Sequence, residues 1–262
     1  MYDPISDSTT RASWAGEPSR SPDSSNFTET LADLVLRKNL PTGEFPEKMG
    51  CCVSTPRAWD PGEPSTTSPA RESTSVFQYR ETELHDANVD GICVGLAAEW
   101  LGNVHNSPRS RMNALAPGSH GYYSAANLQE RYMDIGSSRR TEGAETSQAA
   151  LEARTTVLQS VGLEPSRKEK VYAFDDPESF SSMLKRINKE GSKHLLSLRF
   201  AEGGRHVVAT AVSGGKTTLF DPNYGEFVAE AHQMGSLFQS LANRYRNPNG
   251  LHLSTVSVQK TD

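Results

Sequence analysis

The spacing of the apolar residues changes along the chain, and this change limits the possible folds more than any other feature. Between residues 92 and 101 apolar side chains recur every three to four positions, as in a buried helix. Four later segments are apolar and rich in β-branched residues or alternate with a period of two, as strands do: 194–201, 205–212, 217–221 and 253–258. Helices followed by antiparallel strands predict an α+β fold, in which a helical layer packs against a central antiparallel β-sheet and two layers meet at a cleft.

Local signals predict where several of these elements begin and end. Asp90 or Asn88 is suited to cap the helix over 92–101, and Gly102 is suited to end it. Glycine pairs at 203–204 and 214–215 predict turns between successive strands. Further helices are predicted over 125–133, 146–161, 177–189 and 228–244.

The N-terminal segment 1–75 differs in composition from the rest of the chain. Its apolar fraction is lower than that of 76–262, and Ser, Thr and Pro are concentrated in it. Such a segment buries too little apolar surface to fold alone, so we expect a flexible N-terminal region before a compact domain over residues 76–262. Basic and acidic side chains nearly balance in this domain, which argues against a nucleic-acid partner. No apolar run is long enough to cross a membrane, and the N-terminus lacks the layout of a secretory signal peptide.

A cysteine, a histidine and an aspartate in the predicted domain form a candidate catalytic set. Three cysteines cannot build a disulfide framework, and only Cys93 lies in the domain, at the start of the first helix, where the helix dipole favours a thiolate. His206 begins the most apolar strand, and Asp221 ends the next one, close enough across a short hairpin to orient the imidazole. Taken singly, each has a plainer interpretation: a small buried cysteine, a core histidine and a turn-forming aspartate.

Three segments resemble the YopT/AvrPphB family of papain-like type III effector cysteine proteases, with its rhizobial members nearest. They are NVDGICVGLAAEWL at 88–101, KHLLSLRFA at 193–201 and LFDPNYGEF at 219–227. The resemblance implies a papain-like fold, with Cys93 as nucleophile, His206 as base and Asp221 as the residue that orients it. It also implies that Asn88 contributes to the oxyanion hole together with the backbone N–H of Cys93. Insert lengths between residues 102 and 190 depart from the family pattern, which leaves target choice open.

An acylation motif lies inside the N-terminal region. The sequence from Met49 to Ser54, MGCCVS, fits the myristoylation pattern M-G-x-x-x-S/T, but only a cut between Met49 and Gly50 would expose the glycine. One myristoyl chain anchors a protein only marginally, and palmitoylation of Cys51 or Cys52 would add the second signal. The plainer interpretation is that the two cysteines are idle exposed thiols.

The resemblance implies that the protein cuts itself at this motif. Glu47, Lys48 and Met49 would then be the recognition sequence for self-cleavage. Residues 1–49 would be a disordered leader that carries the secretion signal, and 50–75 a flexible acylated tether. The implied localisation is secretion into a host cell and then the host plasma membrane. The implied partners are host acyltransferases, the host membrane and host protein substrates, with plant protein kinases as one class.

The sequence therefore predicts a cysteine endopeptidase that uses neither cofactor nor metal. Two other hypotheses stay open. In the first, the same Cys93, His206 and Asp221 site transfers acyl groups or deamidates glutamine, because a thioester also reacts with other nucleophiles. In the second, the chain is a non-catalytic, lipid-anchored binding module. Loss of the segment 1–49 on purification supports the protease, and selective alkylation of Cys93 argues against the binding module.

Overall fold

The apolar strands of the second half of the chain form one antiparallel sheet. The computed structural model describes residues 80–82, 91–247 and 249–262. Within these residues, seven strands pair antiparallel in the order β1-β6-β5-β4-β3-β7-β2. Their bounds are β1 Arg80–Thr82, β2 Pro165–Ala173, β3 Lys193–Phe200, β4 Arg205–Ser213, β5 Lys216–Asp221, β6 Gly225–Glu230 and β7 Leu253–Thr261.

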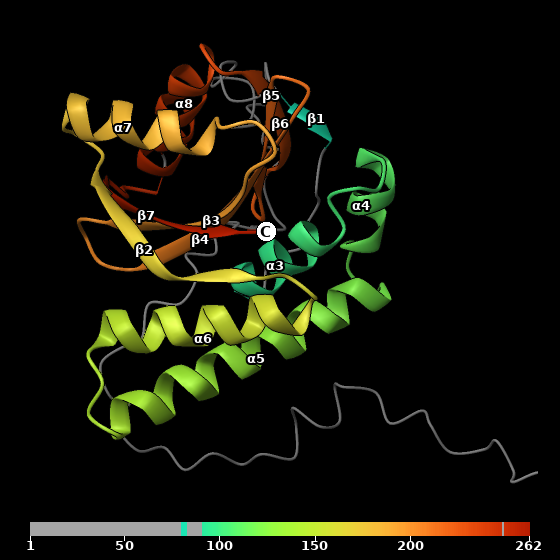
Figure 1. Cartoon of the computed structure of the whole chain (residues 1–262), viewed down its shortest axis with the longest axis vertical. Coiled ribbons are helices and arrows are strands. Elements are labelled where there is room, and N and C mark those ends of the chain that lie inside the picture. Colours follow the sequence, from blue (N-terminus) through green and yellow to red (C-terminus); the bar gives the residue numbers. More distant parts are fainter. Residues whose placement is uncertain (1–79, 83–90, 248) are drawn as a thin grey trace, which may run out of the picture. The chain divides into compact units, whose positions relative to one another are not determined.

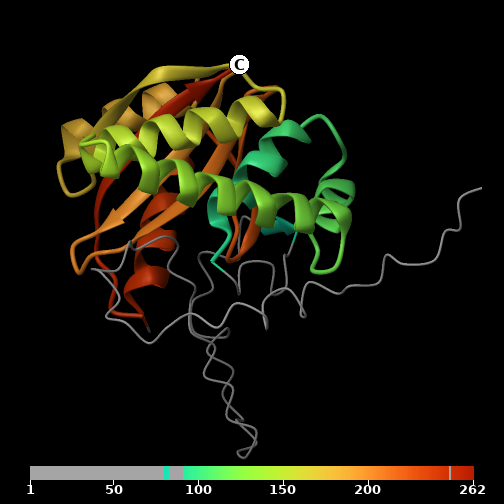
Figure 2. The same ribbon diagram turned by 90° about the horizontal axis from the view of Figure 1, so that it is seen from below.

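Helices cover both faces of this sheet (Figures 1 and 2). Among the described residues, four helices precede β2 and pack on one face: α3 Cys93–Gly102, α4 Pro108–Ala114, α5 His120–Thr141 and α6 Thr146–Ser160. The opposite face is covered by α7 Pro177–Ile187 and α8 Met234–Arg246. The α+β class and the helical layer on an antiparallel sheet are confirmed. The second helical layer is a difference from the two layers predicted.

Alternation along the central strands explains the two helical layers. In β3, Leu195 contributes to the core with α3 and α6, whereas Leu196 and Leu198 contribute to the core with α7 and α8. In β4, Ala209 faces the first core and Val208 the second. Successive side chains point to opposite faces of a sheet, so a strand with apolar side chains on both faces requires cover on both.

The register of the central strands follows from tight turns. Gly214 and Gly215 both have positive φ and form a two-residue loop between Ser213 and Lys216, the turn whose twist suits a hairpin. Leu198 pairs with His206 across β3 and β4, and Ala209 pairs with Phe220 across β4 and β5. This register places the start of β4 close to the end of β5.

The prediction of a helix over residues 228–244 is wrong at its beginning. Residues Gly225–Glu230 form β6, which pairs with β5 and β1, and α8 starts only at Met234. The alternation of buried Phe227 and Ala229 with the less buried Val228 is a strand pattern. In the described part of the chain, no helix is long and apolar enough to cross a membrane.

Candidate active site

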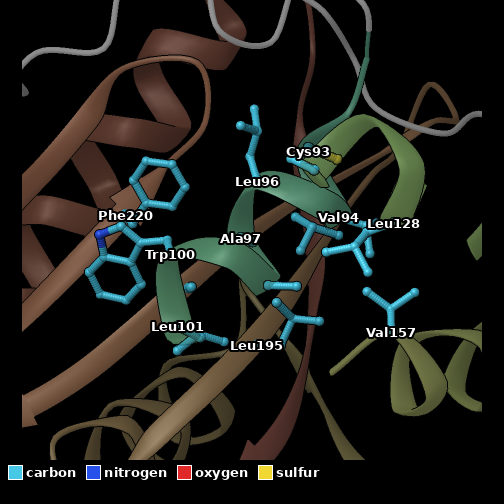
Figure 3. Close-up of a cluster of buried hydrophobic side chains, with 14 of the residues drawn as sticks. Cys93, Val94, Leu96, Ala97, Trp100, Leu101, Leu128, Val157, Leu195 and Phe220 are labelled. Atoms are coloured by element: carbon cyan, nitrogen blue, oxygen red, sulfur yellow. The ribbon is translucent and has the colours of Figure 1, made fainter. Parts of the chain in front are cut away.

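In the described part of the chain, the first helix begins at the candidate nucleophile. Cys93 is the first residue of α3 and is fully buried, and α3 packs against α5 and β4. Figure 3 shows Cys93 at one end of this helix, with Trp100 and Leu101 at the other. Stripes of apolar residues on α3 face the sheet and α5, which explains why so short a helix is almost entirely buried.

The start of α3 is held by a side chain from another helix. The N-cap residue is Ile92, which makes no side-chain cap, and the two residues predicted to cap the helix, Asp90 and Asn88, lie outside the described residues. The Gln129 side chain on α5 is buried, and its Oε1 atom accepts hydrogen bonds from the backbone N–H groups of Val94, at 3.0 Å, and Gly95, at 3.4 Å. These two N–H groups belong to the first turn, whose donors have no partner within the helix.

The structure brings His206 and Asp221 together. Both side chains are fully buried, and His206 Nε2 lies 2.9 Å from Asp221 Oδ1. An ionised carboxylate only accepts hydrogen bonds, so the bonded Nε2 carries the hydrogen and Nδ1 has a lone pair. His206 Nδ1 is buried and has no hydrogen-bond partner among the described residues. The imidazole is thus oriented through one nitrogen, and the other remains available to take up a proton.

Asp221 accepts two further hydrogen bonds. The backbone N–H of Asn223 donates to Oδ1 at 2.8 Å, and the Tyr245 hydroxyl donates to Oδ2 at 2.7 Å. The first bond comes from the turn that Asp-Pro-Asn forms, as a turn-starting aspartate would. The second comes from α8, on the far side of the sheet from α3. No sequence signal links Tyr245 to the site; its spacing from Phe238 and Leu241 indicates only a residue on the buried face of a helix.

An aromatic ring packs beside His206. The Tyr245 ring lies 5.5 Å from the His206 ring, centroid to centroid, and also packs against Phe200 and Tyr224. Burial, followed by the negative charge of Asp221, raises the pKa of Tyr245 well above its ordinary value, so its hydroxyl stays a donor. Because His206 and Asp221 are both fully buried, the hydrogen bond between them forms away from bulk water and is stronger than it would be in solvent.

A buried polar network fixes α3 relative to the strands that carry the pair. Trp100 of α3 stacks on Phe220, the residue before Asp221, with ring centroids 5.4 Å apart, and its indole N–H donates to Glu226 of β6. Arg111 of α4 binds the same carboxylate through two nitrogens, at 2.7 and 2.8 Å. A bidentate, desolvated pair has a defined geometry. No local sequence signal identifies either Arg111 or Glu226 as buried.

Several predicted site residues lie outside the described residues: Asn88, the junction residues Glu47, Lys48, Met49 and Gly50, and the cysteines Cys51 and Cys52. Their roles stay predictions. Among the residues described, no group of three or more His, Cys, Asp or Glu side chains is placed to hold a metal ion.

A helix that begins at a cysteine and packs on an antiparallel sheet with a buried His–Asp pair is the arrangement of papain-like cysteine proteases. The sequence profile of the peptidase C58 family, described as Yersinia/Haemophilus virulence surface antigen, matches residues 71–261. The chain belongs to this family, the YopT/AvrPphB cysteine proteases.

Relatives and a solved structure agree with this assignment. The chain is 54% identical to a protein of Bradyrhizobium diazoefficiens and 53% identical to one of Sinorhizobium fredii, and in each case the match covers 99% of both chains. Both relatives are named as YopT-like cysteine proteases. The crystal structure of the Pseudomonas avirulence protein AvrPphB matches with a TM-score of 0.65 and 25% identity, over 71% of this chain and 99% of that one. The predicted family, papain-like fold and enzyme class are confirmed.

Proposed function

We propose that Cys93, His206 and Asp221 are the catalytic residues and that the protein is a self-processing effector protease. One observation carries this proposal. His206 is bonded to Asp221 through Nε2, has a buried Nδ1 without a hydrogen-bond partner among the described residues, and lies on the strand against which the Cys93 helix packs. A nucleophile at a helix N-terminus and a base oriented by a third group are the parts that thiol activation requires.

The reaction follows from these roles. His206 Nδ1 takes the thiol proton, and Cys93 Sγ attacks the peptide carbonyl carbon. The tetrahedral intermediate collapses to a thioester as His206 gives the proton to the leaving amine. Water, deprotonated by His206, then attacks the thioester and releases the acid, and the proton returns to the thiolate. Asn88 and the Cys93 backbone N–H are proposed to bind the oxyanion; losing one such donor typically costs ~2.7–4 kcal/mol of transition-state stabilisation.

The proposed first substrate is the chain itself, at the bond between Met49 and Gly50. The support is the literal fit of MGCCVS to an acylation pattern that needs an N-terminal glycine. Cleavage after Glu47-Lys48-Met49 would expose Gly50 for myristoylation and place Cys51 and Cys52 beside it for palmitoylation. Two acyl chains give stable membrane attachment, which one does not.

The family supports the remaining parts of the proposal. The match to an avirulence protein of a plant pathogen and to proteins of two rhizobia is consistent with type III secretion into a plant cell. Acylation by host enzymes would then retain the protease at the host plasma membrane. Its targets there would be host proteins, with protein kinases as a class, cut after a tripeptide similar to Glu47-Lys48-Met49.

N-terminal sequencing of the purified protein, together with its intact mass, tests the proposal. We expect wild-type protein to begin at Gly50 and to end at Asp262. Cys93→Ala, with a circular dichroism spectrum like that of wild type, should keep Met1 and the whole leader. His206→Asn should behave likewise, because the base is lost.

His194→Gln is the matched control, since His194 is a second buried histidine on a neighbouring strand outside the pair. It should process itself as wild type does. Cleavage in Cys93→Ala protein would exclude Cys93 as the nucleophile. Active wild-type protein that kept Met1 would exclude self-processing and favour the acyl-transfer alternative.

A further inference from the structure

We propose that Tyr245 is a positioning residue of this protease, which holds the Asp221 carboxylate in the orientation that keeps His206 ready for catalysis. The inference rests on the proposed roles of His206 and Asp221. It adds to them a fourth side chain, supplied by the helix on the opposite face of the sheet.

The Asp221 carboxylate is hydrogen-bonded at both oxygens. Oδ1 accepts from His206 Nε2 and from the Asn223 backbone N–H, and Oδ2 accepts from the Tyr245 hydroxyl at 2.7 Å. Tyr245 thus binds the carboxylate oxygen that His206 does not bind. Because Asp221 is fully buried, this hydrogen bond lies away from solvent. A carboxylate held at both oxygens cannot rotate about its Cβ–Cγ bond without breaking a charged hydrogen bond.

The hydroxyl hydrogen of Tyr245 is directed toward Asp221. A phenol has one hydrogen to donate. Asn223 Nδ2 donates to the Tyr245 oxygen at 3.2 Å, so that oxygen is an acceptor on one side and directs its single hydrogen to Asp221 on the other. Asn223 therefore contacts both partners, through its backbone N–H to Asp221 and its side chain to Tyr245.

The Tyr245 ring also lies beside the His206 ring. Tyr245 is fully buried, and its ring lies 5.5 Å from the His206 ring at an interplanar angle of 49°. One side chain thus packs against the base and donates to the residue that orients it. A contribution of this kind belongs to the transition state, in which the imidazole becomes an imidazolium and needs a fixed counter-charge. It should therefore affect the rate of the chemical step.

The experiment compares Tyr245→Phe, which removes only the hydroxyl, with Tyr172→Phe, which alters another buried tyrosine of the same apolar core. Full-length chains made by cell-free synthesis are followed as they are converted to the fragment that begins at Gly50. The first-order rate of self-cleavage should fall about 10- to 100-fold in Tyr245→Phe, the size of effect expected for one lost charged hydrogen bond, and should not change in Tyr172→Phe.

A double-mutant cycle separates positioning from general stability. If Tyr245 acts through Asp221, then Tyr245→Phe should change the rate less than threefold in an Asp221→Asn background. An equal loss in both backgrounds, or a Tyr245→Phe protein that melts earlier but cuts at the wild-type rate, overturns the proposal.

The pH dependence of Cys93 alkylation gives a readout without substrate. Iodoacetamide labelling is measured between pH 4 and 10 by mass spectrometry of the Cys93 peptide. Tyr245→Phe removes one of the hydrogen-bond donors to the carboxylate that orients His206, so the inflection of this pH profile should move relative to that of wild type. An unmoved inflection counts against Tyr245. If Cys93 of the wild-type chain is labelled normally but the chain does not cut itself, the proposed function is refuted. The inflection of the labelling profile would still test the role of Tyr245 in that case.

Discussion

At the scale of single residues, Gln129 has the clearest consequence for stability. Gln129→Met keeps the length of the side chain but removes the acceptor for the Val94 and Gly95 N–H groups. Unpaired buried donors cost about 1–3 kcal/mol, so we expect the free energy of unfolding to fall by that amount. Urea titration in a Cys93→Ala background, which removes the proposed nucleophile and with it the proposed self-cleavage, measures the change.

Gln129→Glu is the matched variant, because a carboxylate still accepts both hydrogen bonds and suits the positive end of a helix dipole. It should retain most of the stability that Gln129→Met loses. Equal midpoints for Gln129→Met and wild type would show that the two hydrogen bonds do not stabilise α3.

The candidate triad could be predicted from the sequence because each member lies at an element boundary with a local signal. Cys93 begins a helical apolar stripe, His206 follows a glycine pair, and Asp221 precedes Pro222 and Asn223. Gln129 and Tyr245 could not be found in this way. Their partners are distant in the sequence, and only the packing of α5 and α8 brings them into contact.

At the scale of elements, α3 and α5 approach so closely that one position requires glycine. A Cβ atom at Gly95 would lie 1.9 Å from the carbonyl oxygen of Ala125, so Gly95→Ala must push the two helices apart. Overpacking of this kind typically costs about 1–3 kcal/mol, and we expect a loss of that size. Because Gly95 follows Cys93 closely in the first turn of α3, the proposed self-cleavage should also slow. Thermal unfolding and the rate of appearance of the fragment that begins at Gly50 measure the two effects.

Gly136→Ala is the control, since Gly136 lies inside α5 and a Cβ there meets nothing within 4 Å. It should stabilise the protein by roughly 0.5–1 kcal/mol, because alanine loses less backbone entropy in a helix, and leave cleavage unchanged. If Gly95→Ala were as stable and as fast as Gly136→Ala, the close contact of α3 with α5 would be irrelevant to the site.

The elements that the sequence failed to predict share a physical cause. Strand β2 reads PSRKEKVYA and lies at the edge of the sheet, where lysine and arginine face solvent and no apolar alternation is needed. Strand β6 is short and comes just before α8, so its apolar residues merge with those of the helix. The central strands β3 and β4 were predicted to within one residue at each end because burial on both faces leaves a continuous apolar run.

At the scale of the whole domain, the site depends on both helical layers. Cys93 comes from the layer of α3 to α6, whereas Tyr245 reaches Asp221 from the layer of α7 and α8. The sheet between them carries the His–Asp pair. The site is therefore sensitive to the stability of the entire sheet and of both cores.

The pH dependence of global stability can be argued from His194, buried on β3. Burial, followed by the charges of Arg186 and Lys260, lowers its pKa from 6.5 to about 4, and Asp262 acts weakly in the other direction. Between pH 4 and 6.5 the unfolded chain therefore binds a proton at His194 that the folded protein does not bind. The free energy of unfolding is not lowered by this residue above pH 6.5, and it falls as the pH drops from 6.5 toward 4.

The free energy of unfolding should be about 2 kcal/mol lower at pH 5 than at pH 8 because of His194. Urea titrations of Cys93→Ala protein at both pH values measure it, and adding His194→Gln should reduce the difference by about that amount, even if it lowers stability at pH 8. The exposed His105, changed to Gln, should leave the difference unchanged. A pH difference that survived His194→Gln would mean that other groups destabilise the domain in mild acid.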